Sequence, residues 1–511
     1  MTHSPKNHFH LPEISRPQAA AFRPNRRHFC GMCVAGAAVP LASCSVNPAT
    51  GRSSFTGLMS PAEERRVGAE QHPQIIAEFG GEYGSPELRA YVTSIGNQLA
   101  ARTEVAGQLN YTFTILNSDV VNAFALPGGY VYITRGLMAL ADDEAQLAGV
   151  IGHEIGHVVA RHSAERYSKS VVANFGAALL GIALGGGAAE LGAGIAGLAI
   201  QSYSRDQEFE ADILGIRYAT RAGYTADGMP GFLEKLEQDS ALQAKIAGKS
   251  DSSANDANIM STHPRTADRV AKAIEAAKVV RVANPRIGRS EYLNQVDGIL
   301  YGDDPAQGVI RNRKFLHPGL AFTFEAPPGF TLINGAQSVN AVGPRGAQIV
   351  FDIHPGKAPN VSPSDYIQRV WAEKIQVQAV QAITVSGMRA ATGVIRQQTS
   401  NGAADIRLLA IFGSDGYIFR FLFVSPVSAT AQMEEGFRRT TYSFRRLTGP
   451  EAREVKPLLL RVITAQANDS FSRLASTMPF EKFREERFAT LNGISGNTPI
   501  QRGERLKIVS Y

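Results

Sequence analysis

The sequence predicts an α+β protein with three folding units, each marked by its own pattern. Residues 60–280 follow helical patterns, with strand-like segments at Tyr111–Leu116 and Gly129–Thr134. Residues 311–450 alternate apolar and polar side chains, which predicts a strand-rich α/β domain, and residues 455–511 form a third, shorter pattern. With 44% hydrophobic and 19% charged residues, the 511-residue chain does not belong to the intrinsically disordered class.

Individual elements can be placed inside the second unit. Strands are predicted at Ala321–Ala326, Gln348–Ile353 and Ile406–Phe412, and Ser414-Asp415-Gly416 predicts the turn of a hairpin. Ser362-Pro363 predicts the start of a helix, because a capping residue is followed by proline at the first helical position.

The first 43 residues have the layout of an export signal. A basic, polar stretch ends in Arg26-Arg27, and an uncharged segment rich in Gly, Ala and Val follows from Cys30 to Ser43. The paired arginines resemble a twin-arginine signal, and Leu41-Ala42-Ser43-Cys44 resembles a bacterial lipobox. We therefore expect removal of residues 1–43 and a lipid anchor on Cys44. The alternative is an ordinary secretory signal with an incidental cysteine.

Composition excludes several kinds of site and partner for the main body. All three cysteines lie at or before position 44, so no disulfide framework or cysteine-based metal site is available beyond it. Residues 1–43 carry five Lys or Arg and one Glu, so their removal would lower the net charge from +6 to +2. The sequence has no Lys/Arg-rich stripe with interleaved aromatics, and no nucleic-acid partner is expected.

The most informative motif is H-E-x-x-H at His153-Glu154-Ile155-Gly156-His157. A helical pattern from Asp142 leads into it, so His153 and His157 are expected on one helix face, one turn apart. Two neutral imidazoles in this arrangement can bind one Zn²⁺, and Glu154 can take a proton from the water that the metal activates. The alternative, two histidines on a solvated face, is disfavoured by the apolar residues beside them.

A second pair of side chains offers the third protein ligand. Glu208 and Asp212 lie four residues apart in the segment Ser204–Asp212 and therefore share a helical face. Glu208 is the natural ligand, and one position would stay open for water or substrate. Asp212 would orient a ligand histidine through a hydrogen bond. Composition alone does not reject the alternative of an acidic, solvated helix.

The pairing of H-E-x-x-H with a later S-R-x-x-E-x-x-A-D resembles the bacterial HtpX/BepA branch of the metallopeptidases related to the CAAX prenyl proteases. Further matches are Asn122–Gly129 followed by Tyr130–Thr134, then Ala222-Gly223-Tyr224, and finally Thr262-His263-Pro264 with Arg269 after it. The resemblance covers about residues 60–275. It implies a mainly helical, gluzincin-type zinc peptidase domain over 44–280.

The resemblance also implies roles for the residues of the motif. His153, His157 and Glu208 would hold one zinc ion per chain. Glu154 would act as the general base and later as the proton donor, while Asp212 would assist catalysis by orienting a ligand.

The remaining matches imply a place for the substrate. The strand that contains Asn122, Ala123 and Phe124 would pair with an extended peptide by β-augmentation, and Arg269 would stabilise the same region. His263 would approach the zinc and keep the enzyme latent, or it would assist the oxyanion. A plain turn residue is the third alternative for His263.

The sequence departs from the family in two ways. It lacks multiple membrane spans: Ser170–Ala189 is uncharged and long enough to cross a bilayer, but the proposed zinc ligands flank it and must meet, so buried or interfacial helices are expected. It also lacks a tetratricopeptide array after the catalytic domain. Residues 281–310 are irregular and rich in Gly and Pro, and are expected to be a linker.

The C-terminal segment, 455–511, has a weaker resemblance to a LysM module. Asn468-Asp469-Ser470, Leu491-Asn492-Gly493 and Gly503–Ile508 follow the order of such a module, and the length suits a β-α-α-β unit. The resemblance implies peptidoglycan as a partner, although Asn468-Asp469-Ser470 replaces the usual Gly-Asp-Thr. A merely structural C-terminal cap is the alternative. For residues 311–450 the sequence offers no catalytic constellation.

These expectations combine into one function. The chain is expected to be a zinc endopeptidase of the periplasm that hydrolyses misfolded or unassembled envelope proteins. Its lipid at Cys44 would anchor it to a membrane, the outer rather than the inner one. The alternative is a chaperone or cell-wall-anchored assembly factor with a latent zinc site.

Overall fold

The computed structural model describes residues 44–169, 202–248, 263, 267–399 and 402–511. The export signal, including Arg26 and Arg27, and the uncharged stretch 170–189 therefore lie outside the described residues. Among the helices that the structure does describe, none combines the length and the apolar character needed to cross a bilayer.

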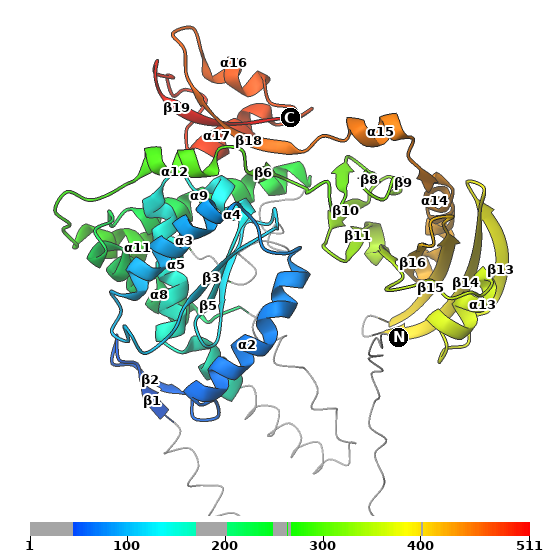
Figure 1. The fold of residues 1–511 in the computed structure, drawn as a ribbon, viewed down its shortest axis with the longest axis horizontal. Coiled ribbons are helices and arrows are strands. Elements are labelled where there is room, and N and C mark those ends of the chain that lie inside the picture. The colour runs from blue at the N-terminus through cyan, green and yellow to red at the C-terminus, as the bar shows by residue number, and fades with distance from the viewer. Residues whose placement is uncertain (1–43, 170–201, 249–262, 264–266, 400–401) are drawn as a thin grey trace, which may run out of the picture.

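The first unit packs helices around a small sheet (Figure 1). Its helices are α2 (Pro61–Glu78), α3 (Pro86–Ala100), α4 (Arg135–Leu140), α5 (Glu144–Val159), α8 (Arg205–Arg221), α9 (Gly228–Ile246) and α11 (Ala267–Lys278). Its strands are β3 (Thr112–Leu116), β4 (Ala123–Leu126) and β5 (Tyr130–Thr134). The sheet order is β3-β5-β4, with β3 parallel and β4 antiparallel to β5, so β4 lies at an edge. The two predicted strand segments, which are β3 and β5, are confirmed.

A short hairpin precedes this unit. Strand β1 (Cys44–Val46) pairs antiparallel with β2 (Ser53–Phe55), and Cys44 lies opposite Phe55. The turn between the strands closes through a hydrogen bond from the backbone N–H of Asn47 to the carbonyl oxygen of Arg52 (2.8 Å). Its backbone passes through Gly51 at φ 74°, a left-handed conformation that favours glycine.

Local signals start the two helices that carry the motifs. The carboxylate of Asp143 caps α5 by accepting a hydrogen bond from the N–H of Gln146 (2.8 Å). Ser204 begins α8 with a reciprocal capping box, in which Gln207 bonds back to the N–H of Ser204.

Glycines let neighbouring helices approach α5 closely. A methyl group at Gly152 would lie 2.9 Å from the carbonyl oxygen of Gly215 on α8. One at Gly149 would lie 2.9 Å from the backbone nitrogen of Met229 on α9. Larger side chains would push α8 and α9 away from α5, and α8 carries the acidic pair of the second motif.

The segment predicted as a linker, 281–310, contains regular structure. Helix α12 (Arg289–Val296) and strand β6 (Leu300–Tyr301) lie within it. Tyr292, Leu293 and Val296 are buried in the same hydrophobic core as α5 and α9.

The second unit contains two antiparallel sheets, the larger of them curved, and is drawn in green, yellow and brown in Figure 1. Its main sheet has the order β10-β11-β12-β16-β15-β14-β13, and a smaller sheet has the order β17-β9-β8-β7. The strands are β7 (Val309–Arg311), β8 (Lys314–His317), β9 (Phe322–Glu325), β10 (Thr331–Asn334), β11 (Ser338–Val342), β12 (Gln348–Ile353), β13 (Gln378–Val385), β14 (Met388–Thr399), β15 (Gly402–Phe412), β16 (Ile418–Pro426) and β17 (Arg445–Arg446). The helices are α13 (Pro363–Asp365), α14 (Thr430–Ser443) and α15 (Gly449–Glu454).

Several sequence predictions for this unit are confirmed. Strand β12 has the predicted bounds, β9 covers Phe322–Glu325, and the turn at Ser414-Asp415-Gly416 joins β15 to β16. Ser362 caps α13, with Pro363 as its first residue. The core of this unit is rich in phenylalanine and is separate from the core of the first unit.

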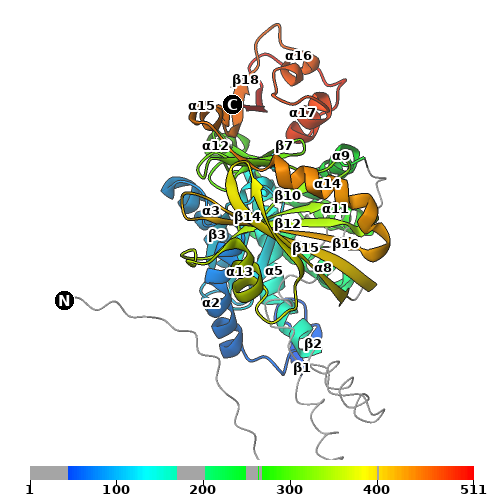
Figure 2. The same ribbon diagram turned by 90° about the vertical axis from the view of Figure 1, so that its right-hand side faces the viewer.

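The C-terminal unit has the order β-α-α-β. It consists of β18 (Leu458–Thr464), α16 (Phe471–Ser476), α17 (Arg484–Asn492) and β19 (Arg505–Ser510). Strand β18 pairs with β19 on one side and with β6 on the other. Figures 1 and 2 both show it beside α12, and Leu460, Leu491 and Leu506 belong to the core of the first unit. The unit therefore shares its core with the helical domain.

Candidate metal centre

Helices α5 and α8 bring the predicted ligand atoms together. The Nε2 atoms of His153 and His157 are 3.0 Å apart. The carboxylate of Glu208 lies 3.7 Å from Nε2 of His153 and 3.6 Å from Nε2 of His157. All three side chains are buried, and Glu208 is 0% exposed.

The spacing and chemistry of these atoms fit zinc. In a tetrahedral site with bonds near 2.0–2.1 Å, neighbouring ligand atoms lie about 3.3 Å apart. The three separations above bracket this value. Two imidazoles and a carboxylate are also the donor set of catalytic zinc sites. Within the described part of the chain, these residues and His263 are the group of histidines and carboxylates close enough to hold a metal ion.

His263 approaches the fourth position. Its Nδ1 lies 3.2 Å from Nε2 of His153 and 2.9 Å from Oε1 of Glu208, and the side chain is buried. Burial acts to lower the pKa of His263, but the carboxylates of Glu208 and Glu154 raise it above its usual value. The structure therefore brings His263 to the centre. His263 itself lies between segments that are not described.

Glu154 lies beside the ligands with both carboxylate oxygens unbonded. It is 0% exposed, and neither oxygen has a hydrogen-bond partner among the described residues. Nε2 of His263 lies 3.6 Å from Oε1 of Glu154. Burial raises the pKa of Glu154, as a general base for water requires. A buried, unpartnered carboxylate at a cluster of ligand atoms is typical of a group reserved for a reactant.

Asp212 and Arg269 hold the ligands in place. Oδ1 of Asp212 lies 2.9 Å from Nδ1 of His153. The guanidinium of Arg269 donates two hydrogen bonds to Asp212 (2.9 and 2.7 Å), and its Nη1 lies 2.6 Å from Glu208. Burial acts to raise the pKa of Asp212, but Arg269 and His153 lower it to about 2. Arg269 thus contacts two carboxylates of the site itself.

Asn122, Ala123 and Phe124 lie at the start of a strand that packs against the helix of the first motif, with Asn122 directly before it. Ala123 and Phe124 begin β4, the edge strand, and β4 packs against α5. The ring of Phe124 packs on Phe79 and Tyr132, so this side chain belongs to the core. All four residues of β4 are buried, so a partner strand would have to reach the backbone of this edge rather than the ring of Phe124.

Two further residues contact His157 and a third, Glu210, contacts one of them; sequence reasoning missed all three. His162 lies 2.8 Å away, nitrogen to nitrogen, and reaches on to Glu210. The ring of Tyr203 stacks on the imidazole of His157 with a centroid separation of 3.8 Å. A histidine five residues after the motif, and a second glutamate two residues after Glu208, were the available signals.

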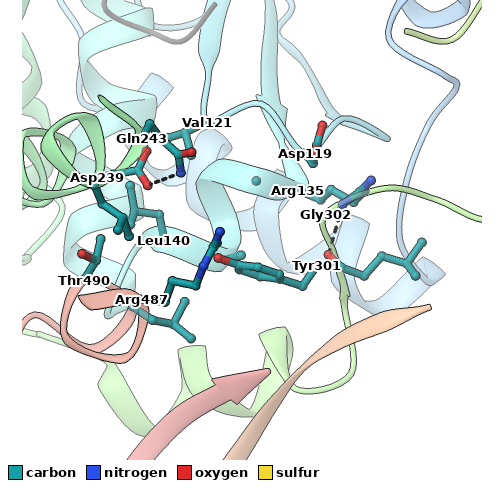
Figure 3. A pocket seen from close by; sticks show the side chains of 15 residues that line it. Asp119, Val121, Arg135, Leu140, Asp239, Gln243, Tyr301, Gly302, Arg487 and Thr490 are labelled. Atoms are coloured by element: carbon teal, nitrogen blue, oxygen red, sulfur yellow. Dashed lines mark hydrogen bonds between the residues drawn. The ribbon is translucent and has the colours of Figure 1, made fainter. Parts of the chain in front are cut away.

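A separate cavity lies away from the metal centre. It has a volume of about 190 Å³ and is formed by α4, α9, β6 and α17. Figure 3 shows Arg487 and Tyr301 facing Asp239, whose carboxylate accepts a hydrogen bond from Gln243 (3.1 Å). None of the predicted site residues lines it.

The sequence was compared with known proteins. Residues 86–277 match the model of peptidase family M48. A beta-barrel assembly-enhancing protease of Escherichia coli (strain K12) is 34% identical over 259 residues, which cover 46% of this chain and 51% of the relative. The protein of the same name from Yersinia pestis is 32% identical, covering 43% and 45%. The mitochondrial metalloendopeptidase OMA1 of Schizosaccharomyces pombe is 25% identical, covering 41% and 59%.

The chain thus spans about half the length of the curated relatives that it matches. The matched region contains every residue of the candidate metal centre, His153, Glu154, His157, Glu208, Asp212, His263 and Arg269. The expected family resemblance is confirmed over this region. Residues 86–277 of the chain are similar to peptidase family M48, whose model they match.

Proposed function

We propose that the chain is a zinc-dependent endopeptidase of the cell envelope that hydrolyses peptide bonds in misfolded or unassembled envelope proteins. One observation carries the proposal. The ligand atoms of His153, His157 and Glu208 converge, and the carboxylate of Glu154, which has no hydrogen-bond partner among the described residues, lies beside them.

The arrangement supports a hydrolytic mechanism. Bound zinc would polarise the scissile carbonyl and lower the pKa of a coordinated water. Glu154 takes a proton from the attacking water as the water oxygen bonds to the carbonyl carbon. Glu154 then returns this proton to the amide nitrogen as the C–N bond breaks. Asp212 keeps the imidazole of His153 in orientation throughout, and Arg269 fixes the carboxylates of Asp212 and Glu208.

The substrate is proposed to bind as an extra strand on β4. This strand is at the edge of its sheet and lies against α5, which carries Glu154. Main-chain hydrogen bonds to such an edge select extended, unfolded segments with little regard for sequence. That selectivity suits a peptidase that removes proteins which have failed to fold or assemble.

The proposal that the protein acts in the cell envelope rests on the predicted export signal and on the names of two relatives. Two relatives are named as beta-barrel assembly-enhancing proteases, which supports an envelope role. An export signal over 1–43 and a lipid on Cys44 would place this chain in the periplasm, on the outer membrane. Peptidoglycan remains the proposed partner of 455–511, on the LysM resemblance.

The decisive test is proteolysis by residues 44–511 of an unfolded outer-membrane β-barrel protein, beside Glu154→Gln. We expect the wild-type chain to bind one zinc ion and to cleave. Glu154→Gln should retain zinc and lose at least about 100-fold in rate, the scale of general acid–base catalysis. Equal cleavage by both chains, or a wild-type chain that binds no zinc, would overturn the proposal.

A second candidate is a chaperone or cell-wall-anchored assembly factor with a latent zinc site. The specific observation that favours it is the position of His263, within ligand distance of the other three residues. Under this proposal, Glu154→Gln suppresses aggregation of an unfolded β-barrel protein as well as the wild type does, and neither chain cleaves it.

A further inference from the structure

We propose that His162 and Glu210 are positioning residues for the zinc ligand His157, and that the turn Asn47–Arg52 locks them in place. The inference rests on the proposed zinc site, and it assigns a role to the N-terminal turn. No motif in the sequence pointed to that role.

The first link joins two imidazoles. Nε2 of His157 faces the other ligand atoms, so its Nδ1 is left for a partner. That partner is Nδ1 of His162, at 2.8 Å. Both rings are buried, at 1% exposed each, so water does not compete for this bond.

The second link joins His162 to a carboxylate on α8. Nε2 of His162 lies 3.4 Å from Oε2 of Glu210. Glu210 follows the ligand Glu208 by two residues on the same helix. One helix therefore supplies a zinc ligand and also orients the ligand on the opposite helix.

The N-terminal turn supplies several hydrogen-bond donors to the carboxylate of Glu210. Asn47 donates from Nδ2 to Oε1 (2.6 Å), Arg52 donates from Nη1 to Oε2 (2.8 Å), and the hydroxyl of Thr50 also donates to Oε1. Arg217 on α8 donates to the carbonyl oxygen of Ala49 (2.9 Å), which fixes the turn to the helix. Asn47, Thr50 and Arg52 are all donors, so toward this turn the carboxylate of Glu210 serves as an acceptor.

A zinc ion bound at Nε2 of His157 requires the proton of this ring to be on Nδ1. Nδ1 of His162, 2.8 Å away, is placed to accept the hydrogen bond from that N–H, and Nε2 of His162 is then placed to donate to Glu210. The network thus suits the tautomer that a zinc ligand needs.

The two ligand histidines are thus held in different ways. His153 has one carboxylate partner, Asp212, which is fixed by Arg269 from α11. His157 has an imidazole between itself and its carboxylate, and the final support comes from the turn Asn47–Arg52. Zinc affinity therefore depends on how the N-terminal hairpin packs against α8.

The test compares zinc affinity with the stability of the metal-free chain. The variants are Glu210→Gln, His162→Leu and His162→Asn, in residues 44–511. Zinc dissociation constants are measured by competition with a chromophoric chelator, and unfolding midpoints are measured after metal removal. We expect Glu210→Gln and His162→Leu to weaken zinc binding about 10- to 100-fold. His162→Asn keeps an acceptor near the Nδ1 position and should recover part of this loss.

A matched control is Glu64→Gln. Glu64 is also a buried carboxylate, bonded to Nε of Arg161 (2.7 Å), but it does not contact a ligand. Its substitution should lower the unfolding midpoint to a similar degree and leave zinc affinity within about twofold of wild type. Arg52→Gln, at the partly exposed end of the network, should fold even if the buried variants do not, and should weaken zinc binding severalfold.

Zinc affinity within twofold of wild type in Glu210→Gln and Arg52→Gln would overturn the inference. That result would leave the proposed function intact as long as wild type cleaves and Glu154→Gln does not. A wild-type chain that binds zinc but does not cleave would refute the peptidase instead, and the zinc constants would still decide the positioning role.

Discussion

Lys507, on the last strand, places its Nζ 3.2 Å from Oδ1 of Asp142, at the entrance to the helix of the H-E-x-x-H motif. The same Nζ donates to the carbonyl oxygens of Ala139, Leu140 and Ala141 (3.0, 3.0 and 2.7 Å). Asp142 also accepts a hydrogen bond from Lys235 (2.7 Å). The C-terminal unit therefore holds the backbone from which α5 begins.

Loss of this contact should destabilise the peptidase unit. Lys507→Met leaves Asp142 and the carbonyl oxygens short of a buried donor, and we expect a loss of about 3 kcal/mol in the free energy of unfolding. Lys482→Met, at an exposed position, is the control. Denaturant unfolding of both variants checks the prediction, and equal stability would contradict it.

Truncation before residue 455 should have a larger effect. The cut exposes apolar side chains of the shared core, among them Leu293 and Val296 of α12. We expect residues 44–454 to aggregate or to lose cooperative unfolding, as measured by calorimetry and light scattering. A fully stable 44–454 chain would show that the C-terminal unit does not contribute to the stability of the first unit.

Removal of zinc should lower stability and stop cleavage together. A metal that binds only the folded chain adds about 2.7 kcal/mol when its free concentration is 100 times its dissociation constant. Chelator should therefore lower the unfolding midpoint, and added Zn²⁺ should restore both midpoint and cleavage. Ca²⁺, which prefers oxygen ligands, should restore neither. An unchanged midpoint after verified metal removal would contradict a zinc site in the core.

His263→Ala should raise basal cleavage. Nδ1 of His263 lies at 3.2 Å from Nε2 of His153, where it competes with water or substrate for the fourth position. The initial rate on an unfolded substrate, at equal zinc content, measures the change, and Glu154→Gln in the same background should abolish the gain. A fall in rate would instead assign His263 to the reaction.

Arg269→Met should be severely destabilising. The substitution leaves the buried carboxylates of Asp212 and Glu208 without their cationic partner. We expect this to lower the free energy of unfolding by about 3–5 kcal/mol. Arg269→Lys should recover little, since one ammonium cannot reproduce the two hydrogen bonds to Asp212. Unfolding midpoints of the metal-free variants test this, and wild-type stability in Arg269→Met would refute it.

Asp303 should make the metal-free chain less stable as the pH rises through 6. Burial and the nearby Asp119 raise the pKa of Asp303 from 3.8 to about 6. The folded chain therefore binds more protons than the unfolded chain between pH 4 and 6. The stability from this group is present below pH 4 and is lost as the pH rises through 6. Between pH 4 and 7, the midpoint of wild type should fall by a few degrees relative to Asp303→Asn. Parallel pH profiles would contradict the assignment.

The short-range parts of the site could be predicted from the sequence. The i, i+4 spacing of His153 and His157 and of Glu208 and Asp212 fixes which helix face each pair shares, whatever the rest of the fold does. Ser362-Pro363 and the turn at Ser414-Asp415-Gly416 likewise act through neighbouring residues, and both are found where predicted.

Contacts between distant segments could not be predicted in the same way. Nothing near Lys507 indicates that its ammonium is 0% exposed against α4, because the carbonyl oxygens that receive it belong to another unit. His162 and Glu210 have ordinary sequence surroundings, and they become partners because α8 packs against α5 and His162 lies three residues beyond the end of α5. A helix within 281–310 was missed because its flanking glycines dominated the local signal.

The β1–β2 hairpin limits how far the peptidase unit can lie from an anchor on Cys44. Cys44 is already part of a strand, and Asn47, three residues later, is bonded to Glu210. Three extended residues span about 10 Å. The proposed acyl group on Cys44 would therefore hold the peptidase unit close to the bilayer, because so little chain separates the lipid from the contact with Glu210. Such an enzyme would meet chiefly those chains that come near the membrane surface.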